Sequence, residues 1–224
     1  FNSSKLFPAV QVNFKDFYKT LAACTTCVGQ INHPGSEKDQ HFNNFEYHKG
    51  ADAQMNLYEF NSKPAWPLFF KALDAGWHLS PVINQDNHSA DWGSKNANRS
   101  GLYMKALDLP SMYAAMSQRR TFMTTDKNAT ISMKAGSCWM GSVLKGASGL
   151  TLTVQAADAD SADLFTSIEL YGKKQTLLAT ASCKGAGPCS ATFPVTASQS
   201  PYFVARAKQK DGGLLVSAPI WLTP

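Results

Sequence analysis

The stretch from Met55 to Ile83, which reads MNLYEFNSKPAWPLFFKALDAGWHLSPVI, decides the fold. Residues 55–60 read MNLYEF, in which aliphatic and aromatic side chains predominate, and this is typical of a strand. A helix is predicted over residues 67–75, because a proline at its start and Gly76 directly after it are common helix boundaries. A second strand is predicted over residues 79–83. The order strand, helix, strand indicates a βαβ unit, in which the two strands run parallel.

The residues on either side extend this α/β pattern. An amphipathic helix with one buried face is predicted near the start of the chain by four residues at helical spacing. These are Phe14, Phe17, Tyr18 and Leu21. Residues 28–31 predict a short strand that leads directly to His33, and residues 111–120 predict a closing helix.

Helical periodicity is lost from about Thr121, and the second half is rich in Thr, Val, Ala, Ser and Gly. Turn formers separate its apolar runs, most clearly at residues 210–213. Six strands are predicted, over residues 150–156, 167–171, 176–181, 191–195, 202–209 and 214–222. We therefore predict an α/β domain of residues 1–120 and an all-β domain of residues 121–224, the latter an immunoglobulin-like β-sandwich.

Side chains able to bind a metal ion follow two of the predicted strands. His33 comes directly after one strand, and Asp86 and His88 come shortly after another. Functional groups of α/β folds lie beyond the carboxyl ends of parallel strands, and residues two apart in an extended segment face the same side. A carboxylate beside imidazole nitrogens suits Zn, Mn or Fe, which activate water for hydrolysis. The alternative is a polar surface loop, since Asp-x-His also arises by chance.

Other residues have both a functional and a structural interpretation. Arg99 is a candidate for binding a substrate phosphate or carboxylate through its planar guanidinium, and a surface ion pair is the alternative. Trp77 and Trp92 are candidates for lining a substrate cleft, although tryptophan is common in cores. The Glu59 carboxylate either points toward the pocket or makes a purely structural hydrogen bond. The remaining histidines are extra ligands or satisfied residues, and they are His41, His48 and His78.

Several motifs resemble, in order, the closing strands of a PHP (polymerase and histidinol phosphatase) domain. They are Gln30-Ile-Asn-His-Pro-Gly35, Leu57-Tyr-Glu-Phe-Asn61, Gly76-Trp-His-Leu-Ser-Pro81, Asn84-Gln-Asp-Asn-His88 and Arg99-Ser-Gly101. The carbaryl-hydrolase-like branch is the most similar, and its trailing β-domain resembles the second half of this chain. That second resemblance depends on Arg119-Arg-Thr-Phe-Met-Thr-Thr125, Trp139-Met-Gly141, Ile168-Glu-Leu-Tyr171 and Ala218-Pro-Ile-Trp221.

The resemblance implies a fold and an activity. The fold would be the C-terminal portion of a PHP-type (β/α)7 barrel followed by the β-sandwich. By the resemblance, His33, Asp86 and His88 would be ligands of a multinuclear metal centre that hydrolyses phosphate or other esters. From the chemistry of the residues, we expect Asp86, His88 and Arg99 to act in catalysis and Arg99 and Trp92 to bind substrate. A phosphodiesterase or phosphatase acting on a small-molecule or nucleotide-like anionic ester is the expected enzyme.

The opening His-x-His motif of that family is absent, since no two histidines stand two apart. A PHP barrel has about seven βα units, and this chain holds roughly the last three. The chain also begins at Phe1 rather than Met, so an N-terminal portion is expected to have been removed. We therefore expect the missing ligands on an N-terminal segment of the same precursor, retained as a second chain after proteolysis.

The cysteines and the apolar pattern indicate the compartment. Cys183 and Cys189 bracket a turn-forming loop and predict a disulfide. Cys24-Thr-Thr-Cys27 has the spacing of a redox motif, but we expect a structural role, either with the two cysteines paired or with one of them bonded to Cys138. A disulfide favours a secreted or periplasmic protein. No apolar stretch approaches the roughly 20 residues that span a bilayer, so no membrane partner is expected.

A different class of function remains open. The chain has 21 basic and 16 acidic residues without a basic run, which does not indicate a nucleic-acid binder. The alternative to a hydrolase is a non-catalytic secreted binding or adhesion module, in which an eroded barrel supports the β-sandwich. A metal-dependent enzyme should bring His33, Asp86 and His88 close together, whereas a binding module need not.

Overall fold

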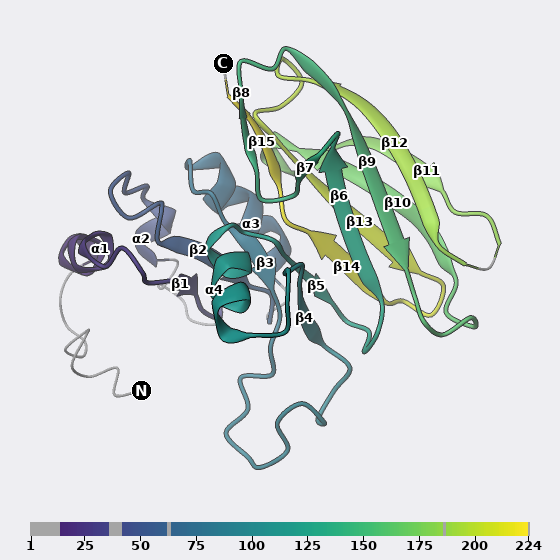
Figure 1. The fold of residues 1–224 in the computed structure, drawn as a ribbon, viewed down its shortest axis with the longest axis horizontal. Coiled ribbons are helices and arrows are strands. Elements are labelled where there is room, and N and C mark those ends of the chain that lie inside the picture. Colours follow the sequence, from purple (N-terminus) through teal and green to yellow (C-terminus); the bar gives the residue numbers. More distant parts are fainter. Residues whose placement is uncertain (1–13, 36–41, 62–63, 186, 224) are drawn as a thin grey trace.

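The computed structural model describes residues 14–35, 42–61, 64–185 and 187–223. The first half contains three helices and three short strands, shown at the left and centre of Figure 1. In chain order they are α1 (Phe14–Ala23), β1 (Gly29–Ile31), α2 (Phe42–Phe45), β2 (Met55–Glu59), α3 (Ala65–Asp74) and β3 (Ser80–Val82). The three strands form a parallel sheet in the order β1-β2-β3.

The predicted βαβ unit is confirmed, because α3 connects the parallel strands β2 and β3. The helix begins directly after Pro64 and ends before Gly76, whose φ of +113° suits a residue without a side chain. Phe69, Phe70 and Leu73 on its inner face are buried. The chain thereby places the carboxyl ends of three parallel strands at one edge of a small sheet.

The second half is almost entirely strand. Its elements are β4 (Arg99–Leu102), α4 (Leu109–Ser117), β5 (Thr121–Thr124), β6 (Thr130–Ala135), β7 (Cys138–Trp139), β8 (Val143–Lys145), β9 (Gly149–Ala157), β10 (Phe165–Gly172), η2 (Lys173–Gln175), β11 (Thr176–Ser182), β12 (Cys189–Thr196), β13 (Tyr202–Gln209), β14 (Leu214–Ser217) and β15 (Ile220–Thr223). The single strand predicted over residues 214–222 is wrong. It is interrupted at Pro219, which has no N–H for a ladder bond.

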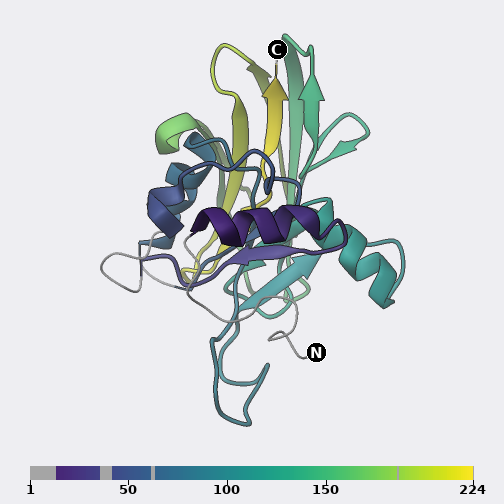
Figure 2. The same ribbon diagram turned by 90° about the vertical axis from the view of Figure 1, so that its left-hand side faces the viewer.

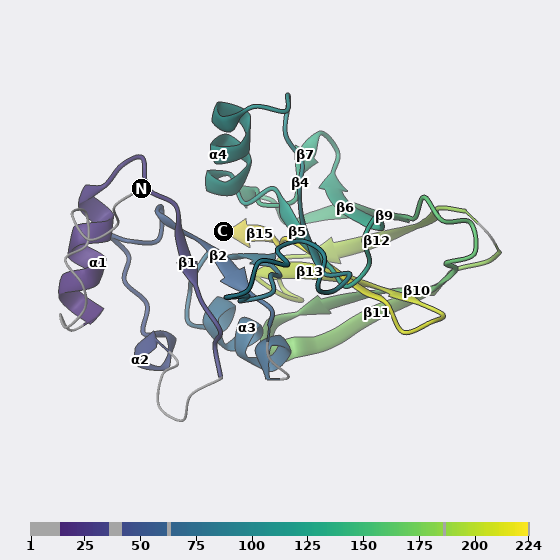
Figure 3. The same cartoon turned by 90° about the horizontal axis from the view of Figure 1, so that it is seen from below.

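Two sheets pack face to face as a β-sandwich. The larger has the order β11-β10-β13-β14-β5-β4, with β15 pairing with β13 and with β8, and the smaller has the order β12-β9-β6-β7. Figure 3, seen from below, shows α1, β1 and β2 to the left of these sandwich strands. The predicted combination of an α/β part with an all-β part is therefore confirmed.

The larger sheet is buried on both faces, so the molecule has three layers. On β13, Val204 packs into the hydrophobic cluster shared with α3, whereas Phe203 and Ala205 pack into the cluster between the two sandwich sheets. Met123 and Phe122 on β5 divide between the same two clusters. Alternate side chains along one strand thus belong to different cores.

Hydrogen bonds and a ring contact also fix helix α3 to the larger sheet, which is the central layer. The hydroxyl of Tyr202 donates to Asp74 Oδ1 at 2.6 Å, and the backbone N–H of Lys174 donates to the same carboxylate. The Trp66 ring lies 5.1 Å from the Tyr171 ring. These contacts tie the α/β layer to the sandwich.

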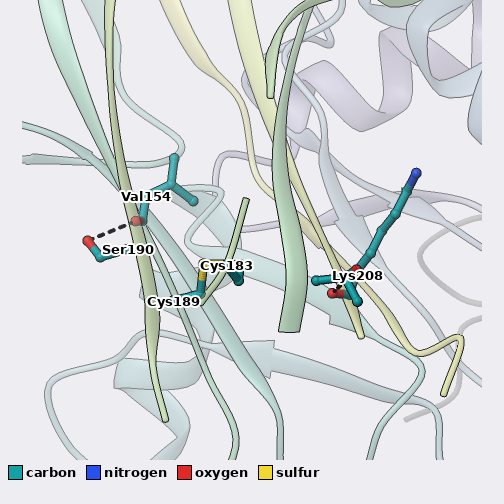
Figure 4. The surroundings of a disulfide bond; sticks show 6 residues. Val154, Cys183, Cys189, Ser190 and Lys208 are labelled. Atoms are coloured by element: carbon teal, nitrogen blue, oxygen red, sulfur yellow. Dashed lines mark hydrogen bonds between the residues drawn. A yellow bond between two sulfur atoms is a disulfide. The ribbon is translucent and has the colours of Figure 1, made fainter. Parts of the chain in front are cut away.

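The predicted Cys183–Cys189 disulfide is confirmed. Figure 4 shows the bridge where β11 leads into β12, beside Ser190, whose hydroxyl bonds to the carbonyl of Val154 on the neighbouring strand β9. Cys24 and Cys27 form a second disulfide, and Cys138 is free. Of the two pairings that the sequence left open, the local one is therefore correct.

The strands that the structure describes close no barrel, because β1, β2 and β3 form an open sheet. Sheet pairing also continues across residue 120, since β4 pairs with β5. The division into residues 1–120 and 121–224 stays a prediction. No helix within the described ranges is long and apolar enough to cross a membrane.

Candidate functional site at the carboxyl edge of the parallel sheet

The ends of β1 and β2 meet at one edge of the parallel sheet. Ile31 pairs with Tyr58, so His33 and Glu59 follow at nearly the same level. The Glu59 side chain is only 2% exposed, and its Oε2 accepts a hydrogen bond from the backbone N–H of His33. His33 is half-buried and has a φ of +33°, which turns the chain after the strand. A buried carboxylate therefore fixes the position of the predicted metal ligand.

The third strand leads into a long loop, residues 83–98, which joins β3 to β4. Figure 2 shows this loop projecting below the body of the molecule. Its base is closed by Ser100, whose hydroxyl accepts from the N–H of Ile83 at 2.8 Å and donates to the carbonyl of Ile83 at 2.7 Å. The loop is thus anchored where it leaves the sheet.

Arg99 holds the loop in shape. Its Nη1 donates to the carbonyls of Asn96 and Asn98, at 3.0 and 2.7 Å, and its Nη2 donates to the carbonyl of Gly93 at 2.9 Å. The amide of Gln85 reinforces this arrangement by bonding to Asn96 Oδ1 and to the N–H of Gly93. No described residue accepts from Nε of Arg99, so the Nε side of the guanidinium is available to a ligand.

A hollow of about 450 Å³ lies within the loop, lined by residues 83–87, 92–93 and 98–100. Three predicted site residues, Asp86, Trp92 and Arg99, line it together. The Trp92 side chain is 73% exposed, and its Nε1 donates to the carbonyl of Asn87 at 3.3 Å. The arrangement offers a flat aromatic face and a guanidinium edge in one open depression.

The three predicted metal ligands, unlike the residues that line the hollow, do not come together. Among the described residues, His33, Asp86 and His88 do not form a group with ligand atoms within 4.8 Å of one another. Asp86 has a φ of +43°, which breaks the extended conformation from which a common direction for Asp86 and His88 was predicted. His88 is exposed and does not line the hollow. The role of these residues as ligands stays a prediction.

The other histidines differ in their surroundings. The Nδ1 of His78 lies 2.6 Å from Asp52 Oδ2, and its ring packs 4.9 Å from that of Trp221, which makes it a structural residue. His48 lines a second hollow of about 260 Å³ beside α1, where its Nδ1 and the Tyr18 hydroxyl are buried without a described partner. His41 lies outside the described residues. Trp77 is fully buried, so it belongs to the core and not to a cleft.

Sequence reasoning missed one cluster of possible ligands. Asp126, Asp158 and Asp163 come from two different loops, and their carboxylate oxygens lie within 4.8 Å of one another. The acidic run Asp158-Ala-Asp160-Ser-Ala-Asp163 is the signal that could have drawn attention to it. Asp126 could not have been found, because its proximity is created by the sandwich.

No protein-family model and no curated protein matches this chain. Similar solved structures include an engineered protein, which is 17% identical over 42% of this chain and 20% of its own, with a TM-score of 0.28. The C-terminal domain of wzt is 8% identical over 62% of this chain and 88% of its own, with a TM-score of 0.26. A beta-glucosidase from Listeria innocua in complex with isofagomine is 9% identical over 77% of this chain and 37% of its own, with a TM-score of 0.26. The chain spans between a fifth and two fifths of the engineered protein and the beta-glucosidase, and TM-scores at this level carry no argument about fold or function.

Proposed function

We propose that this chain is the C-terminal part of a secreted or periplasmic metal-dependent hydrolase of the PHP superfamily that acts as a phosphoesterase. The observation that supports this proposal is the common edge at which β1, β2 and β3 end, where His33 follows β1, Glu59 is the last residue of β2 and the Asp86 loop follows β3. Ligands of open α/β sheets bind beyond the carboxyl ends of such strands. The finer fold is part of the proposal, namely the last strands of a barrel followed by an immunoglobulin-like sandwich.

The substrate would bind in the hollow of the β3–β4 loop. Arg99 has its Nη1 and Nη2 bonded to loop carbonyls, and its Nε would donate to an oxygen of a phosphate or carboxylate. Trp92 would contact the rest of the substrate through its exposed ring. An anionic ester of small-molecule or nucleotide-like size suits both groups.

The metal ions would be Zn, Mn or Fe, but the described donors do not form a complete ligand set. His33, Asp86 and His88 lie apart, and three dispersed ligands cannot hold a multinuclear centre. We therefore propose that an N-terminal segment of the same precursor, present as a second chain, contributes the remaining ligands and orders the Asp86 loop. The two disulfides support an oxidising compartment.

The test is made on the protein purified from its native source. Intact mass and N-terminal sequencing identify any second polypeptide, and elemental analysis measures Zn, Mn and Fe. Hydrolysis of bis(p-nitrophenyl) phosphate and p-nitrophenyl phosphate is then measured for recombinant complexes carrying His33→Ala, Asp86→Asn or Arg99→Ala. Lys127→Ala, at an exposed turn far along the chain, is the matched control. A metal-free single chain without hydrolytic activity would overturn the proposal.

A binding or adhesion module is the second candidate, and one observation favours it. The structure leaves the predicted ligands apart while presenting an exposed Trp92 beside Arg99 in an open depression. Such a surface can bind an anionic ligand without catalysing a reaction. Its signature would be ligand binding that Trp92→Ala and Arg99→Ala weaken, in a protein that holds no transition metal.

A further inference from the structure

Three connections meet at one end of the β-sandwich and bring acidic side chains together. Asp126 lies between β5 and β6, Asp158 and Asp163 lie between β9 and β10, and Asp211 lies between β13 and β14. Figure 1 shows these three connections at the lower end of the sandwich. The carboxylate oxygens of Asp126, Asp158 and Asp163 lie within 4.8 Å of one another.

The negative charge of this cluster is not balanced by the protein. Across the described residues, none of these aspartates forms an ion pair. Like charges held this close repel one another, so a cation at their centre would stabilise the folded chain.

Local hydrogen bonds hold the carboxylates in place. Asp126 Oδ1 accepts from the backbone N–H groups of residues 128 and 129, at 2.9 and 3.1 Å. Asp158 Oδ1 accepts from the N–H of Asp160 at 2.7 Å. In each of these turns only Oδ1 accepts the backbone hydrogen bonds, so Oδ2 can contact other groups. Turns of this kind also form where no ligand is bound.

Gln209 provides an independent indication of a ligand. Its side chain is buried, with 4% of the residue exposed, and its Nε2 donates to Asp158 Oδ2 at 2.7 Å, which places the amide against the cluster. Its Oε1 is buried and has no hydrogen-bond partner among the described residues. A Cβ added at Gly213 would meet this Oε1 at 2.0 Å and Asp211 Oδ1 at 3.3 Å, so the unpartnered oxygen lies against Gly213 and near Asp211. A buried amide oxygen without a partner is unfavourable unless something binds it.

We infer that this end of the sandwich is a calcium site, with Asp126, Asp158 and Asp163 as ligands and with Gln209 and Asp211 beside the ion. All of these donors are oxygens, which Ca²⁺ prefers, whereas Zn and Fe sites also use the nitrogen or sulfur donors that this cluster lacks. Ca²⁺ accepts six to eight oxygen ligands in flexible geometry, which suits side chains from separate turns. The ion would join three connections of the sandwich at one end.

The test uses the whole chain after removal of metal with EGTA. Isothermal titration with CaCl2 measures stoichiometry and affinity, and thermal unfolding is followed with and without Ca²⁺. We expect one Ca²⁺ per chain, a higher Tm with Ca²⁺, and a clearly smaller effect of Mg²⁺ at the same concentration. Asp158→Asn and Asp163→Asn should each weaken Ca²⁺ binding by roughly tenfold or more. Asp16→Asn, which removes an exposed carboxylate of α1, is the matched control and should bind Ca²⁺ like the original chain.

The sign of the stability change separates a binding role from a structural one. In EGTA, Asp163→Asn relieves repulsion, so its Tm should equal or exceed that of the original chain. In Ca²⁺ the order should reverse. The inference would be overturned by the absence of binding heat and of a Tm shift up to about 10 mM Ca²⁺, by an unchanged shift in Asp163→Asn, or by equal destabilisation with and without Ca²⁺.

Discussion

The backbone N–H of His33 donates a hydrogen bond to the carboxylate of Glu59, so the ends of β1 and β2 are joined by a side chain. Glu59 is almost completely buried, and a buried carboxylate is costly unless it is paired or bonded. Its presence at this edge therefore indicates a defined position for His33. The hydrogen bond between Glu59 and the His33 N–H positions His33 whether or not this edge of the sheet binds a metal.

Two substitutions of Glu59 distinguish its role as a hydrogen-bond acceptor from the effect of its negative charge. Glu59→Gln retains an oxygen for the His33 N–H, so we expect a small change in the free energy of unfolding. Glu59→Ala removes that acceptor in a partly buried place and should cost about 1–3 kcal/mol. Urea unfolding measures both, with Glu46→Ala at an exposed position as control. Equal effects of the Gln and Ala substitutions would contradict this account of the bond.

The bonds from Arg99 to three loop carbonyls predict a local change in stability. Lysine at this position cannot span all three acceptors, because it has one ammonium in place of a planar fork. We expect Arg99→Lys to leave the global unfolding free energy nearly unchanged while tryptic cleavage after Lys95 becomes severalfold faster. Arg120→Lys is the control. An unchanged cleavage rate would show that the loop does not depend on Arg99.

Glu169 on the central sheet predicts a pH dependence. Burial raises its pKa, but hydrogen bonds from Lys208, Arg206 and Tyr171 outweigh that effect, so the pKa is lowered. A lowered pKa in the folded state adds stability above the unfolded value, and this stability is lost as the pH falls through the folded value. Urea midpoints at pH 7 and pH 3 should therefore differ less in Glu169→Gln than in the original chain.

The same variant should be less stable at neutral pH. Removing the charge leaves Arg206, which stacks over Trp66 at 4.7 Å, and Lys208 without their acidic partner. Breaking a buried ion pair costs about 3 kcal/mol. Glu169→Gln with an unchanged midpoint at pH 7 and an unchanged pH slope would show that the cluster contributes nothing to stability.

Local patterns could be predicted from the sequence, and relations between distant segments could not. The βαβ unit depends on neighbouring residues, from Met55 to Ile83, and the Cys183–Cys189 bridge spans one short loop, so both were predicted correctly. The continuous apolar run Tyr202-Phe-Val-Ala205 indicates a strand covered on both faces, and the third layer could have been expected from it.

For the candidate sites too, residues close in sequence could be placed together, whereas contacts between distant segments could not be predicted. Asp86, Trp92 and Arg99 are close in sequence, and the structure places them around one hollow. Whether His33 lies near His88 depends on the path of a long loop, which carries no periodic signal. The contribution of Asp126 to the acidic cluster requires β5, β6 and β9 to be aligned first, and no spacing in the sequence encodes that alignment.

The bond between Tyr202 and Asp74 tests whether the layers fold together. The Tyr202 hydroxyl, on the central sheet, donates to Asp74 at the end of α3, and burial with this bond raises the pKa of the tyrosine. A hydrogen bond to a charged group contributes about 1.5–3 kcal/mol, so Tyr202→Phe and Asp74→Asn should each destabilise the chain and should not be additive. Because one hydrophobic cluster contains residues of both halves, we expect a single unfolding transition in urea, followed by tryptophan fluorescence and by far-ultraviolet circular dichroism. Two separate transitions, with Tyr202→Phe shifting only one, would instead establish residues 1–120 and 121–224 as independent domains.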